Sequence, residues 1–406
     1  MTASEQLAQF AAGSKALPKL CREYKKERAT VHLKELVGGA LSFYAAAAVA
    51  KTGGVHIFVA EDRDAAAYLL NDFYNLLDEK QVYFFPSSYK RSAAYGAEDA
   101  QGVVQRTTAM NAVRGFTKGY LVVCTYPEAL AERVVDAATL QRDTIAVKLG
   151  DKISIAVLED ALADANFTRV DFVYEPGQYS VRGGIVDVFS YSESKPYRID
   201  FFGDEVDSIR RFNISSQLSA DKLDRVEIVP NLNAGEAPRV SFVQFAGSSA
   251  TCWFYDADYV LRRVNDLRRK VLADMEEPGQ IDRLLTSRNV LLRDMAGNSV
   301  VALRDNLPER PATAAVVFDT APQPKFNKNF EMLADDMIRN SLRGYATYIL
   351  SENKVQVERL ENIFHQIGRG QAAVRSLSVT LHEGFVDNDL KLCLYTDHQI
   401  FDRYQR

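Results

Sequence analysis

The chain has 406 residues, of which 47% are hydrophobic and 25% are charged. These ordinary globular values predict two to four compact units and argue against a disordered chain. Lys and Arg total 49 against 54 Asp and Glu, which gives a net charge of −5. That balance disfavours a strongly basic nucleic-acid binder, although it is compatible with a local basic patch.

Neither a membrane span nor a secretory signal is expected. No stretch approaches 18 consecutive apolar residues, and the start MTASEQLAQF lacks a charged segment followed by an apolar run. Four cysteines, Cys21, Cys124, Cys252 and Cys393, lie far apart and form no C-x-x-C pair. This spacing indicates reduced core thiols in a cytoplasmic protein, and no disulfide framework or zinc site.

Residues 1–142 alternate predicted strands with predicted helices. Apolar runs at 55–60, 82–85 and 120–124 are typical of buried parallel strands. After the first run, apolar residues recur at helical spacing, namely Ala66, Leu69, Leu70, Phe73, Leu76 and Leu77. The segment Thr125–Glu128 predicts a helix start with a capping box and Pro at the first helical position. This unit is therefore expected to be α/β with a parallel sheet.

Residues 143–231 are strand-rich and predict an inserted α+β unit. Within 197–201, apolar side chains alternate with Arg198 and Asp200, so one face of this strand is expected to be buried. Turn signals divide the segment at 175–177, 183–184 and 203–204. The pattern predicts an antiparallel meander packed on the helix that precedes it.

Two further units follow a predicted linker, NLNAGEAP. Residues 232–320 contain a predicted strand at 253–255 and an amphipathic helix, and residues 326–406 return to strand and helix after a polar break. The expected fold class is α/β: a degenerate RecA/P-loop-like parallel-sheet domain, an inserted α+β domain, and a further small α/β domain.

A mononucleotide site would need a glycine-rich loop after the first strand, with Lys on the phosphates and a Ser or Thr hydroxyl on Mg²⁺. Gly38 and Gly39 could form such a turn, but Ala40 and Leu41 stand where Gly-Lys is needed, and no Gly-Lys dipeptide occurs in the chain. Ser42 alone is a helix-start residue. We expect a nucleotide-binding scaffold without its nucleotide and therefore no cofactor.

Other catalytic patterns are weak. Asp256 ends a predicted strand but is not followed by Glu, as an acidic partner of that site would be. The five histidines, His32, His56, His365, His382 and His398, are not at metal-ligand spacing. Asp397 and His398 are neighbours that would point to opposite faces of a strand. No metal site and no catalytic residue are predicted.

A surface candidate lies in the second unit. Arg169 opens one predicted strand and Arg182 precedes a Gly-Gly turn, with Phe172 and Tyr179 nearby. Guanidinium groups pair bidentately with carboxylates and aromatic rings supply contact area, so the combination suits a protein interface. Solvated arginines are the structural alternative.

Two segments, residues 175–189 (EPGQYSVRGGIVDVF) and 197–212 (YRIDFFGDEVDSIRRF), carry a family resemblance and occur in the same order as in that family. They resemble the insert domain of the excision-repair protein UvrB and, more closely, its counterpart in the bacterial transcription-repair coupling factors (Mfd). Residues 383–404 resemble the segment that precedes the polymerase-interacting domain of that family. The missing Lys, and a short stretch at 86–105 with only Tyr89 and Tyr95, depart from UvrB and match the coupling factors.

The resemblance implies a DNA-repair adaptor that recruits UvrA to stalled RNA polymerase in nucleotide excision repair. The family's UvrA-contacting arginines match Arg169 and Arg182, with Tyr179 and Phe189 beside them, whereas Ser180 stands where UvrB has a further arginine. The resemblance also implies an N-terminal fragment that packs on the C-terminal domain of a longer, ATP-dependent DNA translocase. RNA polymerase and DNA would be contacted through domains outside this chain.

Two alternatives stay open at this stage. One is a UvrB-like, ATP-dependent DNA repair helicase, which nucleotide binding by this chain would support. The other is direct DNA binding through Arg22, Lys25, Lys26 and Arg28, which a steep salt dependence would reveal.

Overall fold

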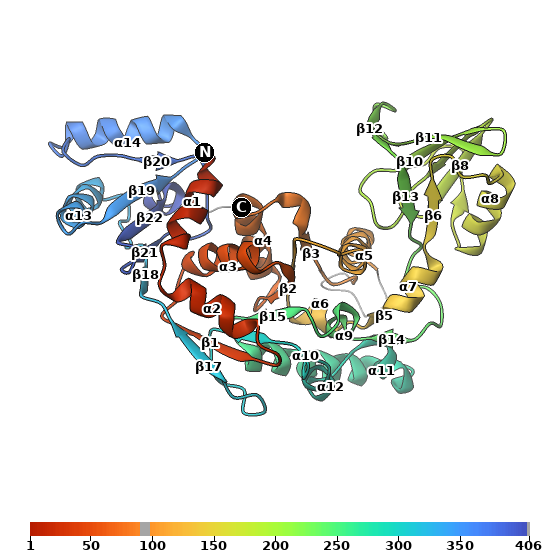
Figure 1. Ribbon diagram of the computed structural model, residues 1–406, viewed down its shortest axis with the longest axis horizontal. Coiled ribbons are helices and arrows are strands. Elements are labelled where there is room, and N and C mark those ends of the chain that lie inside the picture. Colours follow the sequence, from red (N-terminus) through yellow and green to blue (C-terminus); the bar gives the residue numbers. More distant parts are fainter. Residues whose placement is uncertain (90–97, 404–406) are drawn as a thin grey trace.

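A seven-stranded, wholly parallel sheet forms the centre of the computed structural model, which describes residues 1–89 and 98–403 (Figure 1). Its strands in spatial order are β17 (Ala314–Val317), β1 (Thr30–Lys34), β16 (Val300–Ala302), β15 (Thr251–Phe254), β2 (Gly54–Val59), β4 (Tyr120–Thr125) and β3 (Val82–Phe84). Strands from residues 1–142 and 232–320 are interleaved here. Both stretches therefore build one sheet.

Helices cover both faces of this sheet. Along β4, Leu121 and Val123 face one hydrophobic cluster while Val122 and Cys124 face the other, as the two-residue repeat of a strand requires. The first cluster is covered mainly by α5 (Ala100–Arg114), α6 (Pro127–Ala131), α9 (Phe242–Ala246), α10 (Ala257–Asp274), α11 (Ile281–Leu284) and α12 (Arg288–Asp294). The second is covered mainly by α1 (Ala3–Ala12), α2 (Ala16–Tyr24), α3 (Ala40–Thr52) and α4 (Arg63–Leu76).

A second sheet stands apart, to the right in Figure 1. Its order is β12 (Ser219–Leu223), β11 (Glu205–Phe212), β10 (Tyr197–Phe202), β9 (Ile185–Val188), β8 (Gln178–Arg182) and β7 (Thr168–Arg169). The predicted antiparallel meander is confirmed for β8 to β12, whereas β7 pairs with β8 in parallel. The apolar face packs on α8 (Ile155–Asp164).

The chain enters and leaves this unit through two paired strands. These are β6 (Ile145–Lys148) and β13 (Arg225–Ile228), which form an antiparallel two-stranded stem. Short elements on the body side of the stem include α7 (Ala137–Asp143) and the paired strands β5 (Val134–Val135) and β14 (Arg239–Val240). The second unit is thus an insertion carried on a narrow connection.

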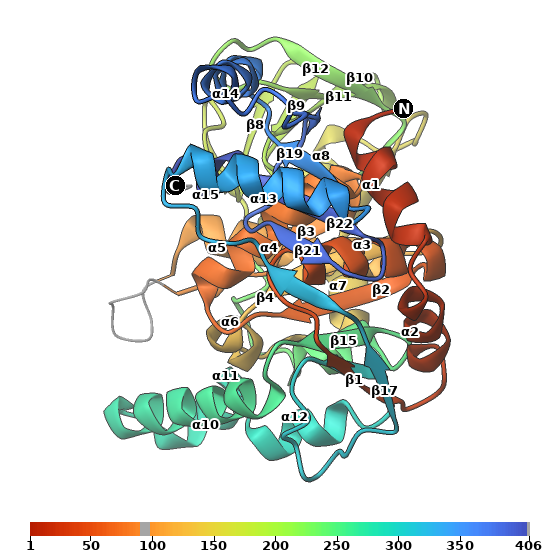
Figure 2. The same cartoon turned by 90° about the vertical axis from the view of Figure 1, so that its left-hand side faces the viewer.

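The third sheet is small and mixed. It contains β18 (Thr320–Pro322), β21 (Phe385–Asp387), β22 (Leu392–Thr396), β19 (Ala346–Leu350) and β20 (Ser376–Leu377), with α13 (Phe330–Leu342), α14 (Lys354–Gln366) and α15 (Asp397–Ile400). Figure 2 shows β21 and β22 beside α3. Leu381 and Phe385 are buried in the same cluster as Phe43 of α3, so this sheet shares a core with the first unit. The expected fold class is confirmed.

One local prediction is wrong and another lies partly outside the described residues. The N-cap of α6 is Tyr126, and it makes no side-chain cap. The hydroxyl of Thr125, the residue expected to cap the helix, instead donates to the carbonyl of Phe85 at 2.8 Å. The predicted capping box is therefore absent. In the stretch 86–105, Tyr95 lies outside the described residues. Across the described ranges, no helix has the length and apolar character to cross a bilayer.

Candidate protein-interaction surface

The loop after β1 has the position of a phosphate loop but does not offer its groups to a phosphate. The amides of Ala40 and Leu41 donate to the carbonyls of Val37 and Gly38, at 3.2 and 3.4 Å. The Ser42 hydroxyl donates to the Gly39 carbonyl at 3.1 Å and to the Asp72 carboxylate at 2.7 Å. With Leu41 in place of the cation, these residues do not fit a nucleotide with Mg²⁺.

Asp72 of α4 is the polar centre behind this loop. It is buried and accepts hydrogen bonds from the Ser42 hydroxyl and, at 2.8 Å, from the backbone N–H of His382. Burial raises the pKa of this carboxyl to about 7, although both hydrogen bonds oppose the shift. The Asp72 carboxylate, the Ser42 hydroxyl and the His382 backbone N–H therefore satisfy one another.

The other chemical candidates have structural roles. Asp256 caps α10 and accepts the backbone N–H of Tyr259 at 3.0 Å. His398 lies in α15 and not in a strand, so the predicted strand geometry is wrong there, and its Nε2 contacts the His382 carbonyl at 2.6 Å. Among the described residues, no group of three His, Cys, Asp or Glu side chains could hold a metal ion.

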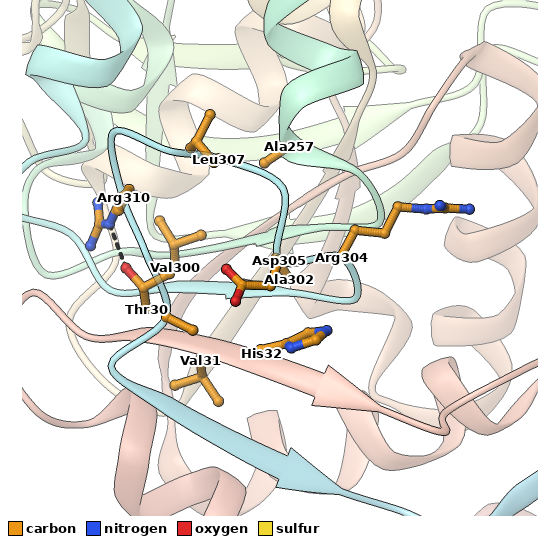
Figure 3. A pocket seen from close by; sticks show the side chains of 11 residues that line it. Thr30, Val31, His32, Ala257, Val300, Ala302, Arg304, Asp305, Leu307 and Arg310 are labelled. Carbon is orange, nitrogen blue, oxygen red and sulfur yellow. Dashed lines mark hydrogen bonds between the residues drawn. The ribbon is translucent and has the colours of Figure 1, made fainter.

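A pocket beside His32 and Arg304 is too small for an organic ligand (Figure 3). Its volume is about 10 Å³, which is the room of one water molecule at most. Arg310 crosses its rim and donates to the Thr30 hydroxyl at 2.7 Å and to the Met295 carbonyl at 2.6 Å. This arginine ties the ends of strands together and is not a free cation.

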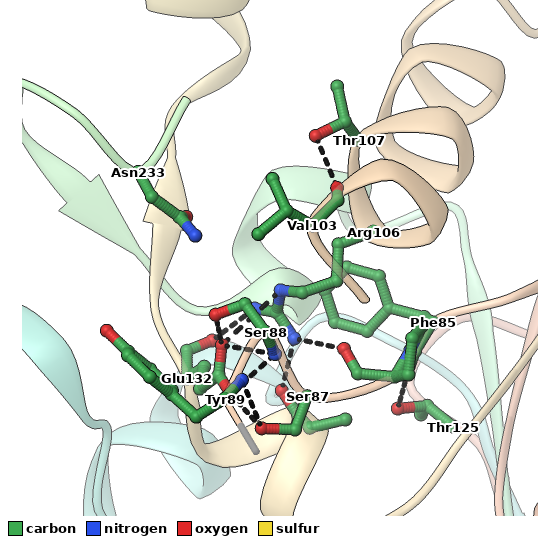
Figure 4. A network of polar contacts seen from close by, with 12 residues as sticks. Phe85, Ser87, Ser88, Tyr89, Val103, Arg106, Thr107, Thr125, Glu132 and Asn233 are labelled. Carbon is green, nitrogen blue, oxygen red and sulfur yellow. Dashed lines mark hydrogen bonds and ion pairs between the residues drawn. The ribbon is translucent and has the colours of Figure 1, made fainter. Parts of the chain in front are cut away.

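A buried ion pair that the sequence analysis missed lies under the end of β3 (Figure 4). Arg106 and Glu132 each have only 4% of their side chain exposed, and Arg106 Nε lies 3.5 Å from Glu132 Oε2. Arg106 also donates to the carbonyls of Pro86 and Ala129 at 3.0 and 2.9 Å, while Glu132 accepts the backbone N–H of Ser88 at 3.0 Å. The available signal was an arginine on the apolar face of a helix, between Val103 and Met110.

The two candidate arginines lie on the edge strand β7 and on its neighbour β8. Arg169 of β7 has 60% of its side chain exposed, and its Nη1 lies 3.0 Å from Glu159 Oε1 of α8. Arg182 of β8 has 44% exposed, and its guanidinium carbon lies 5.0 Å from the ring centroid of Phe172. Phe172 and Tyr174 are themselves exposed. We call Arg169, Phe172, Tyr174 and Arg182 the arginine edge.

A buried carboxylate orients Arg182. Asp187 of β9 is only 3% exposed and accepts Arg182 Nη2 at 2.9 Å. It also accepts Arg198 Nε and Nη2, at 2.8 and 2.9 Å, in a bidentate pair. Because Arg198 is largely buried over the ring of Phe212, it serves as the fixed side of this network. Arg182 is the member that faces solvent.

The remaining site candidates do not lie on this surface. Tyr179 and Phe189 are buried, as is Ser180, so these three side chains could affect a partner only by fixing the position of the strands they sit on. Among the four basic residues near the start, Lys26 is ion-paired with Glu23 at 2.9 Å. The structure therefore brings Arg182 together with the exposed Phe172, whereas Arg169 lies beside Glu159 of α8.

Comparison with protein families identifies the inserted unit. Residues 145–233 match the model described as the UvrB interaction domain. The match begins at β6 and ends after β13, so it covers the six-stranded sheet and its stem. This part of the chain is similar to UvrB interaction domains, and we refer to it by that name.

Curated relatives extend the likeness beyond that domain. The transcription-repair-coupling factors of Bacillus subtilis and Escherichia coli are each 27% identical over 199 residues, which are 49% of this chain. The factor of Haemophilus influenzae is 35% identical over 101 residues, or 25% of this chain. The matches cover 17%, 17% and 9% of these relatives' own lengths. The chain thus contains a region homologous to the N-terminal part of transcription-repair coupling factors.

Proposed function

We propose that this chain is a non-catalytic adaptor of transcription-coupled nucleotide excision repair, and that its UvrB interaction domain binds UvrA. The arginine edge is the observation that carries this proposal. It joins two partly exposed guanidinium groups to two exposed aromatic rings on the domain that the family comparison identifies. Arginine and aromatic side chains dominate the binding energy of many protein interfaces.

The electrostatics of the edge favour an acidic partner. Each arginine has one carboxylate neighbour, Glu159 for Arg169 and Asp187 for Arg182. A guanidinium group has five N–H donors, so donors remain for carboxylates of a second protein. Asp187 holds Arg182 in place before binding, which reduces the ordering cost of the complex.

The finer roles belong to the same proposal. In a longer protein of the coupling-factor kind, this region would also contact the C-terminal domain, while RNA polymerase, DNA and ATP would be handled by other domains. We propose that residues 1–406 do not hydrolyse ATP. Support comes from Leu41 at the position of the phosphate-binding Lys and from the internal hydrogen bonds of Ser42.

Calorimetric titration of purified UvrA into this chain tests the proposal. We expect Arg169→Ala and Arg182→Glu each to weaken binding at least tenfold, because truncating one member of a buried interfacial charge pair costs about 2–5 kcal/mol. Arg269→Ala is the control, since Arg269 of α10 is also exposed and ion-paired but lies outside the domain. Unchanged affinity in both edge variants would remove the assignment.

A further inference from the structure

The Gly-Gly turn after β1 is in contact with the third sheet. A methyl group placed on Gly39 would lie 1.9 Å from the carbonyl oxygen of Glu383. One placed on Gly38 would lie 3.1 Å from the carbonyl oxygen of Gly384. The backbone of the segment 381–385 thus lies directly on the turn, and this close approach requires both glycines.

Side chains around the turn hold the same segment. Asp72 accepts the N–H of His382 at 2.8 Å, and the amide of Asn75 donates to the Thr380 carbonyl at 3.0 Å. The rings of Tyr68 and His382 stack with centroids 3.7 Å apart. Helix α4 therefore binds the segment and its neighbour Thr380 through polar and aromatic contacts.

The apolar contacts point the same way. Leu381 and Phe385 are completely buried, and the rings of Phe43 and Phe385 have centroids 5.2 Å apart. The hydroxyl of Tyr44 donates to the carboxylate of Asp387 just beyond the segment. Burial of this kind is the largest favourable contribution to docking one unit on another.

The chemistry of this occupant is the reverse of what a phosphate needs. Phosphate binds where backbone N–H groups and a helix N-terminus present positive charge. Here the atoms nearest the turn are carbonyl oxygens, and a carboxylate oxygen of Glu383 would lie 3.5 Å from a methyl group on Gly38. A phosphate would meet both a steric clash and electrostatic repulsion.

We infer that residues 381–385 are a built-in occupant of the vestigial phosphate loop. They fasten the third sheet to the first unit, and they exclude a nucleotide independently of the missing Lys. The loop has become an intramolecular docking site. This inference does not depend on UvrA binding, so either can fail without the other.

Gly39→Ala isolates the contact. Gly39 has φ −67° and ψ −7°, a conformation that alanine adopts freely, so the Glu383 carbonyl is the obstacle to the substitution. Gly279→Ala is the matched control, because a methyl group there has no neighbour within 4 Å. We expect Gly39→Ala to lower Tm and to raise amide hydrogen exchange across residues 381–385 at least tenfold, with neither change in the control.

Unchanged exchange in Gly39→Ala would overturn the docking. If that variant yields no folded protein, Asn75→Ala removes the hydrogen bond to Thr380, the residue just before the segment, and should raise exchange in 381–385 by a smaller factor. No change in Asn75→Ala then overturns the docking instead.

Restoring the lost motif tests the exclusion. The double variant Ala40→Gly, Leu41→Lys supplies Gly-Lys before Ser42, and we expect it not to bind a fluorescent ATP analogue with Mg²⁺ in an anisotropy titration up to millimolar concentration. Saturable binding, with residues 381–385 still protected from exchange, would show that the Lys alone was missing and would overturn the inference.

Discussion

Arginine has opposite roles in the central body and in the UvrB interaction domain. Arg106 and Arg310 are deeply set in the body, and each gives several N–H groups to main-chain carbonyls. In the interaction domain, Arg182 makes one hydrogen bond within the described part of the chain and Arg169 one ion pair. The number of donors already used separates an arginine that supports the fold from one that can bind a partner.

The largest effect is expected where an arginine is fully enclosed. Arg106→Ala should lower the free energy of unfolding by about 3–5 kcal/mol, because it leaves the Glu132 carboxylate buried without its charge partner. Urea denaturation measures this. The control is Arg263→Ala, which breaks an exposed pair with Glu128 and should cost no more than about 1 kcal/mol. Equal losses in both variants would show that enclosure does not distinguish the two arginines.

An intermediate effect is expected at the carboxylate that orients the arginine edge. Asp187→Asn removes the charge that holds Arg182 and Arg198, so UvrA affinity should fall by roughly tenfold, or about 1.4 kcal/mol. Calorimetry measures the affinity, and circular dichroism should show an unchanged fold. Asp221→Asn, at the exposed carboxylate that pairs with Arg211, is the control and should leave binding as it was. A loss of affinity in the control alone would place the contact elsewhere on the sheet.

The smallest effect concerns pH and belongs to the body. Burial raises the pKa of Asp72 from 3.8 to about 7, so the folded chain keeps a proton that the unfolded chain has released, and stability falls as pH rises through this window. Between about pH 6.5 and 8 the loss should be about 1 kcal/mol, and Asp72→Asn should abolish it. His56 acts in the opposite direction: burial lowers its pKa to about 4, so near pH 6.5 the unfolded chain takes up a proton that the folded chain does not, and this contribution raises stability slightly as pH rises. Stability that still falls with rising pH across this range in Asp72→Asn would contradict the assignment.

Local elements were predictable from sequence because their signals are local. The apolar runs that predicted β2 and β4 reflect strands buried on both faces, and the helical spacing of α4 reflects its apolar face. The insertion of β15 and β16 between β1 and β2 was not predictable, since strand order depends on pairing between distant segments. The failed capping box has a similar cause, because a tertiary bond to Phe85 occupies the Thr125 hydroxyl.

The candidate site likewise has features that the local sequence predicts and features that depend on distant contacts. The positions of Arg169 and Arg182 on strands next to turns were visible in the sequence, and both are exposed as a surface role needs. The burial of Tyr179 was not visible, because alternation along a strand does not say which face the core covers, whereas Phe189 at a strand end could equally be a core residue, and it is buried. Nor did the sequence explain Gly39, whose requirement comes from Glu383 in the loop that precedes β21.

The antiparallel stem has an evolutionary consequence. Ile145 on β6 is paired directly with Ile228 on β13, so the chain returns to its point of departure after completing the interaction domain. A gene segment encoding residues between these two points could be gained, lost or transferred to another host scaffold without displacing the flanking polypeptide. Such portability would let an unrelated scaffold acquire the same unit by a single recombination event.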